Sequence, residues 1–175
     1  MPRLAAGGAY HPLKRQDTQL KAYFSAIGDK TRRAVLGDEH VDSLMNSRTN
    51  FDEPWFQYVT NINWGGTWAR GILSRQQLSL INLAMLAGAG QMIEFERHFR
   101  IALVTNKVPL TQLRELLLHI GQYCGIPTGA EIFLIARRVM EKEGVDPSDM
   151  EPLDTSPLYG NAEQSNSGPE NPGGA

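Results

Sequence analysis

An all-α domain is the fold class that this sequence predicts, and three observations favour it. Through the central part of the chain, apolar residues recur at intervals of three and four, which is the periodicity of amphipathic helices. Residues typical of helix starts and helix stops bound these segments. No run of alternating β-branched residues indicates a strand. The sequence therefore predicts about six helices and no sheet.

The two ends of the chain lack this periodicity. Residues 1–16 mix glycine, proline and charges, and residues 146–175 are rich in proline, glycine, serine and asparagine. Segments of this kind bury too little apolar surface to offset the entropy lost on ordering. We therefore expect a flexible N-terminal tail, one folded domain over residues 17–145 and a disordered C-terminal tail.

The first helices of the domain are expected over residues 20–36 and 54–62, where the apolar pattern is weakest. The next helix begins more sharply, because Ser74 is a good N-cap residue. It continues to about Ala87 and ends at Gly88, since glycine favours the backbone conformation that closes a helix.

Three further helices follow in the second half of the domain. Apolar and charged residues from 92 to 104 alternate with a period of about 3.6 residues. A leucine-rich stripe predicts a helix over residues 110–124, with Gly125 as its stop. Pro127 fits the first turn of the last helix, which runs to a stop at Gly144.

Composition excludes several classes of protein. The chain has 175 residues, 41% of them hydrophobic, which is enough for one domain with a real core. A net charge of −2 gives no basic surface for nucleic acid or an anionic membrane. The single cysteine, Cys124, excludes an intrachain disulfide and is expected to be buried. The longest apolar stretch, Leu78 to Ala89, is shorter than the ~20 residues of a transmembrane helix. We expect a cytoplasmic protein.

A glutamate followed four residues later by a histidine occurs twice, as Glu94 with His98 and as Glu115 with His119. This spacing places both members on one helical face, where a carboxylate can orient an imidazole for proton transfer. Such pairs are also common on solvated helices, where they contribute only ~0.2–0.5 kcal/mol. A metal site is disfavoured, because di-iron helical bundles use Glu-x-x-His and further carboxylates. We expect no metal.

Other side chains could complete a pocket around these pairs. His98 borders the apolar face of its helix, and His119 lies one turn before Tyr123, so the two histidines could line one pocket between paired helices. Tryptophans could wall a pocket for a flat or cyclic ligand, and arginines could bind an acid. These candidate binding residues are Trp64, Trp68, Arg70 and Arg75.

Four segments, in order along the domain, carry a resemblance to the carboxymuconolactone decarboxylases. They are TRRAVLGDEHVD (31–42), NFDEPWFQYVTNINWGGTWAR (50–70), LINLAMLAGAGQMIEFERHFRIAL (80–103) and TQLRELLLHIGQYCGIPTGAEIF (111–133). The resemblance implies an all-helical fold shared with the AhpD-like alkylhydroperoxidases. It also implies a cofactor-free enzyme, usually a ring-shaped hexamer, that decarboxylates a γ-lactone acid and moves its double bond. We accordingly expect a homo-oligomer, a trimer or a hexamer, acting on a small cyclic acid.

The same resemblance assigns roles to the Glu/His pairs. His98 matches the histidine of the family's Leu-His-Leu/Val-Arg stretch, which implies that it delivers a proton to the carbanion left by carbon dioxide, with Glu94 orienting it. Glu115 matches the glutamate of the family's Arg-Glu-Val-Leu-Leu stretch, and with His119 it would support the pocket. Gln91 and Glu94 stand where the peroxidase branch has its two cysteines, so dithiol chemistry is absent.

One departure bears on the substrate. The pattern of the decarboxylases near the start of their central helix is similar to Asp-Arg-x-x-Arg-Ser-Leu. In the corresponding residues 74–80 of this chain, Leu78 stands in place of the second arginine. A leucine cannot bind a carboxylate in bidentate fashion, so either Arg75 takes over or the substrate differs. We expect another cyclic lactone or enol acid, or an aromatic polyketide-type acid, in secondary metabolism or aromatic catabolism. The alternative is a catalytically silent relative that serves as a ligand-binding or assembly subunit.

Overall fold

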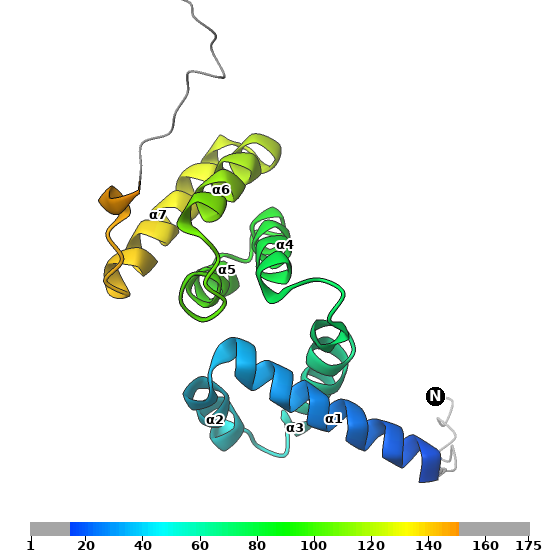
Figure 1. Ribbon diagram of the computed structural model, residues 1–175. Coiled ribbons are helices and arrows are strands. Elements are labelled where there is room, and N and C mark those ends of the chain that lie inside the picture. Colours follow the sequence, from blue (N-terminus) through cyan, green and yellow to red (C-terminus); the bar gives the residue numbers. More distant parts are fainter. Residues whose placement is uncertain (1–14, 151–175) are drawn as a thin grey trace, which may run out of the picture. The chain divides into compact units, whose positions relative to one another are not determined.

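The computed structural model of the protein describes residues 15–150 (Figure 1). The chain divides into two units, residues 1–145 and 146–175. Of the second unit, the described part is one 3-10 turn, η4 (Pro147–Asp149), which is capped by the Asp146 carboxylate. Both expected tails lie largely outside the described residues, so their disorder stays a prediction.

The first unit confirms the all-α fold class, since the described residues form helices and no strand. Seven α-helices and three shorter helical segments follow one another (Figure 1). They are α1 (Arg15–Leu36), α2 (Asp38–Ser47), α3 (Glu53–Tyr58), the π-helical η1 (Val59–Gly65), the 3-10 turn η2 (Trp68–Arg70), α4 (Arg75–Gly88), α5 (Met92–Arg100), the π-helical η3 (Ile101–Thr105), α6 (Leu110–Cys124) and α7 (Ile126–Lys142).

Local capping residues explain several of these boundaries. At the start of α4, the Ser74 hydroxyl accepts a hydrogen bond from the Gln77 backbone N–H, and the Gln77 side chain accepts one from the Ser74 N–H. This reciprocal capping box confirms the predicted helix start. Between α6 and α7, Gly125 has a φ of 97°, a conformation that favours glycine and turns the chain sharply from one helix into the next.

Helices α4 to α7 enclose the larger core. Phe95 and Phe99 on α5 are fully buried, with Leu83 from α4, Leu113 from α6 and Ile132 from α7. Helices α6 and α7 pack closely where two glycines face each other. A Cβ added at Gly129 would lie 2.9 Å from the Gly121 Cα, so this approach depends on the missing side chains. The core fixes which face of α5 points inward, and therefore where its histidine lies.

A second, smaller core forms where α1 packs against η1. Gly28 and Gly65 allow this contact, because a Cβ at Gly28 would clash with the Thr60 carbonyl and one at Gly65 with that of Phe24. The buried members of this core are Val35, Trp64, Trp68 and Ile101. Ile101 comes from η3, directly after α5, so this core joins α1 and η1 to the rest of the unit.

Several predictions about the elements need correction. Helix α2 was not predicted, because it is short and polar and buries only Val41. The helices expected over 54–62 and 92–104 are not α-helical throughout. Each changes from α-helix to π-helix, the first at Val59 and the second at Ile101. Cys124 is exposed, because α6 ends there and its core face is occupied by Leu117, Ile120 and Gly121. Among the described helices, none is long and apolar enough to cross a membrane.

Candidate active site

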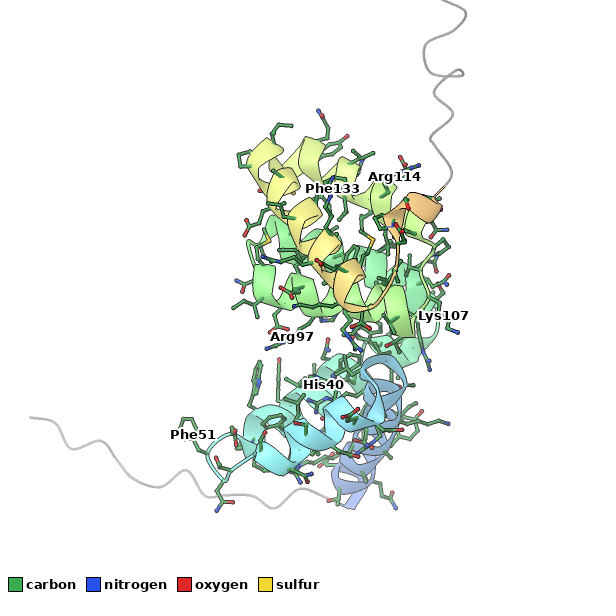
Figure 2. The ribbon with its side chains drawn as sticks, turned by 90° about the vertical axis from the view of Figure 1, so that its left-hand side faces the viewer. His40, Phe51, Arg97, Lys107, Arg114 and Phe133 are labelled. Atoms are coloured by element: carbon green, nitrogen blue, oxygen red, sulfur yellow. The ribbon has the colours of Figure 1, made fainter. Side chains whose placement is uncertain are left out.

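A cavity of about 470 Å³ lies between α5 and the elements α1, α2, α3 and η1. Helix α5 lines the cavity with Glu94, Arg97 and His98. Apolar side chains, among them Ile101 and Trp64, line it as well. Arg97 and the α2 residue His40 lie on facing sides of this cavity (Figure 2). Its volume falls in the range of small-molecule sites, about 300–1,000 Å³.

His98 reaches this cavity because the larger core orients α5. Phe95 and Phe99 point into that core, and His98, three residues after Phe95, borders their face and is half-buried. Burial lowers the pKa of His98, the nearby Glu94 carboxylate raises it, and the Arg97 guanidinium lowers it. The net direction is downward, so the free imidazole is mainly neutral at pH 7.

Glu94 is placed as predicted on the same cavity wall, but its direct partner is another residue. Its carboxylate accepts a hydrogen bond from Arg97 at 2.5 Å, and both side chains are about half exposed. Within residues 15–150, no hydrogen bond joins Glu94 to His98. Glu94 therefore acts on the imidazole through its charge, in competition with Arg97.

The second pair lies elsewhere in the single chain. Glu115 and His119 are exposed on α6 and line an open surface hollow with Leu80 and Thr111. The Glu115 carboxylate pairs with Arg114 at 3.1 Å, and the His119 ring packs on Tyr123 with centroids 4.6 Å apart. Helix α6 packs on α4 and α7. The expectation that His119 shares the pocket of His98 is therefore not met, and the roles of this pair stay predictions.

The candidate substrate-binding residues are similarly divided. Trp64 lines the cavity and contacts Trp68 at a centroid distance of 5.2 Å, but Trp68 itself is buried in the smaller core. Arg70 is exposed beside a separate hollow, and Arg75 donates a long hydrogen bond of 3.4 Å to the Ala34 carbonyl. Tyr123 is 77% exposed on α6. Of this group, Trp64 alone is brought together with His98.

Sequence reasoning missed the most unusual residue of the cavity, Arg32 on α1. It is only 4% exposed and its pKa is lowered, mainly by burial. Its Nη1 donates to the Thr60 hydroxyl at 3.3 Å, and its guanidinium lies 5.7 Å from the centre of the Phe56 ring. The spacing places Arg32 on one face of α1 with Gly28 and Val35, but the structure is what shows that this face is buried.

Among residues 15–150, His, Cys, Asp and Glu side chains do not gather in groups of three or more that could hold a metal ion. The cavity is lined by two imidazoles, of His40 and His98, by the Glu94 carboxylate, by three arginines and by aromatic rings.

Comparison with known proteins agrees with the resemblance. The sequence model of the carboxymuconolactone decarboxylase family matches residues 53–138. The chain is 34% identical over 113 residues to the nitrosuccinic acid decarboxylase npaB of Metarhizium robertsii, covering 65% of this chain and 78% of that protein. It is 31% identical over 120 residues to the 4-carboxymuconolactone decarboxylase of Acinetobacter baylyi, covering 69% of this chain and 89% of that protein. The chain belongs to the carboxymuconolactone decarboxylase family.

Membership of the carboxymuconolactone decarboxylase family confirms the prediction of a carboxy-lyase at the level of the family. No solved structure matches the chain. The matched residues 53–138 contain Glu94, His98 and both members of the α6 pair, whereas Arg32 and His40 come before them. One wall of the cavity is therefore built from a part of this chain that the family model does not cover.

Proposed function

We propose that this enzyme decarboxylates a compact organic acid in the cavity beside α5, and that His98 supplies the proton that replaces carbon dioxide. The observation that carries the proposal is the half-buried imidazole of His98 on the wall of a cavity of ligand size. General acids placed in this way contribute about 10²–10⁴-fold to a rate.

The reaction balances without a cofactor. The bond between the substrate carbon and its carboxylate breaks, and its electron pair passes into an electron-withdrawing group of the same substrate while carbon dioxide leaves. The His98 imidazolium then gives its proton to the carbanion carbon and becomes neutral. A bound acid adds negative charge to the cavity, which favours the imidazolium, so proton uptake accompanies binding.

The finer substrate class also belongs to the proposal. The two relatives are named for nitrosuccinic acid and for 4-carboxymuconolactone, both small acids. The rings of Trp55, Phe56 and Trp64 border the cavity and suit a flat or cyclic skeleton. We therefore propose a cyclic lactone or enol acid, or an aromatic polyketide-type acid, from aromatic catabolism or secondary metabolism.

The test is to incubate the protein with γ-carboxymuconolactone and with a panel of aromatic β-keto and hydroxy acids in deuterated water. Release of carbon dioxide with one deuteron bound to a carbon of the product is expected, either at the carbon that lost the carboxylate or at a carbon conjugated with it, and His98→Ala should lose this activity. The alternative of a catalytically silent subunit, motivated by Leu78, predicts binding with no product. Full turnover by a folded His98→Ala variant would overturn the role of His98.

We also propose that the enzyme works as a homo-oligomer, a trimer or a hexamer. Large apolar side chains are exposed on α4, α6 and α7, namely Met85, Leu118 and Leu134. Burial of such faces between copies is a common reason for association. Light scattering at several concentrations would test this, and a monomer throughout would contradict it.

A further inference from the structure

Arg32 is a buried cation that no carboxylate neutralises. None of the ion pairs within residues 15–150 includes Arg32. Three arginines, Arg32 among them, line the cavity. The other two are paired, Arg97 with Glu94 and Arg100 with Glu143 at 2.6 Å. Arginines almost never lie this deeply buried without a paired anion. The exception calls for a partner that the chain itself does not supply.

We propose that Arg32 is the binding site for a second carboxylate of the substrate, the one that is retained in the product. Arg32 thereby makes the enzyme prefer a compact diacid to the corresponding monoacid. This inference rests on the proposed function, because it assigns the part of the substrate that His98 does not act on.

The donors of Arg32 fit a carboxylate. A guanidinium has five N–H donors in a planar fork, and Nη1 donates to the Thr60 hydroxyl and, at 3.9 Å, to the Met45 sulfur. The Nε–H is buried and has no hydrogen-bond partner. A buried N–H donor without a partner costs free energy, and a carboxylate can accept from Nε and a terminal nitrogen at the same time.

The nearest acid on the same helix does not fill this role. The Asp29 charge raises the pKa of Arg32, but less than burial lowers it. The Asp29 carboxylate instead accepts from Nε of Arg33 at 3.0 Å, and Arg33 also pairs with Asp38 and Asp42. Two adjacent arginines thus differ: Arg33 has three acidic partners, and Arg32 has none within ion-pair distance.

The chemistry decides which carboxylate Arg32 holds. Decarboxylation moves negative charge out of the departing carboxylate, so a cation bound to that group would stabilise the bound substrate more than the transition state. Arg32, on α1, is therefore suited to the carboxylate that keeps its charge. The departing carboxylate then lies toward His98 on α5. Leu78 is consistent with this, since it packs against the smaller core and does not line the cavity.

The experiment compares two four-carbon acids that cannot react, succinate and butyrate, by calorimetric titration of the full chain. Wild type should bind succinate at least tenfold more tightly than butyrate. Arg32→Lys and Arg32→Gln should reduce this preference by about 10- to 100-fold, because the bidentate charged contact is lost. Arg138→Gln is the matched control, since Arg138 is exposed on α7 and pairs with Glu96 outside the cavity.

A second measurement needs no variant to fold. In arginine-labelled wild type, the Arg32 Nε–H signal should move downfield when succinate is added and stay in place with butyrate. Equal affinity for the two acids, no succinate binding up to tens of millimolar, an unmoved signal or a preference that survives in Arg32→Lys would each overturn the inference.

The two proposals fail separately. If the preference for succinate is independent of Arg32 while His98→Ala loses turnover, the diacid inference is wrong and the proposed function stands. If His98→Ala keeps full turnover, the catalytic assignment is wrong, whatever Arg32 binds.

Discussion

Helices α5 and α6 carry the same Glu-x-x-x-His motif in two different environments. On α5, His98 is half-buried at a cavity, and its pKa is lowered by burial. On α6, His119 is exposed, and Glu115 pairs with its neighbour Arg114. The spacing is identical, so the difference comes from the core residues that orient each helix and from the elements that face it. The spacing of a motif determines whether two side chains can lie close together. The surrounding fold determines their burial and their other partners, and so their chemistry.

The largest expected effect tests the difference between the two histidines directly. His98→Ala should lower kcat by about 100-fold or more, because a general acid is lost. His119→Ala should cost less, since its ring contacts Tyr123 at the surface. Steady-state kinetics of both variants, with circular dichroism as the control for folding, would check this. Equal losses would mean that α6 reaches the site of another copy of the chain.

A smaller effect concerns the two charges beside His98. Because the proton donor must be protonated, kcat/KM should fall as pH rises above the pKa of His98, which lies below that of an ordinary histidine. Glu94→Gln should move this fall to lower pH, and Arg97→Gln should move it to higher pH, because Glu94 raises and Arg97 lowers that pKa.

Glu96→Gln is the matched control for these variants. Glu96 is on the same helix, but it pairs with Arg138 and Lys142 and does not line the cavity. Its pH profile should coincide with that of wild type. Shifts of Glu94→Gln and Arg97→Gln in the same direction would contradict the electrostatic account of His98.

The smallest expected effect is on stability. The pKa of His98 is lower in the folded chain, so the unfolded chain binds more protons between that value and about 6.5. Stability should therefore rise with pH through this window, and the destabilisation that comes from protonating the half-buried imidazole is complete once pH falls below it. Urea midpoints at pH 5.5 and 7.5 should differ less in His98→Asn than in wild type. An unchanged difference would show that burial does not oppose protonation of His98.

Local signals made most of the fold predictable from the sequence. The cap at Ser74 and the stop at Gly125 depend on neighbours along the chain, and both lie where they were expected. Helix α2 could not be found in this way, because its position depends on α1 and on the turn at Gly37 more than on an apolar stripe. The same holds for the π-helical segments that begin at Val59 and Ile101.

The candidate site was predicted less completely, for a physical reason. His98 and Glu94 come from one helix, so their spacing was enough to place them together. Arg32 is buried by Thr60 and Phe56, which are distant in sequence and come from η1 and α3. Whether a charge is buried depends on such tertiary contacts, which a single helical pattern does not contain.

His98 stands just before the point where the chain passes from one core to the other. Phe99 is anchored among α4 to α7, and Ile101 is anchored with Val35 and the tryptophans. Within three positions after the imidazole, the chain thus enters two packing environments, one at Phe99 and the other at Ile101, with the exposed Arg100 between them. Substitutions in the larger core could change the angle of the proton donor without altering a residue that lines the cavity, because none of the buried members of that core lines it. For an engineer, the buried positions around Phe99 are therefore sites at which specificity can be altered from outside the cavity.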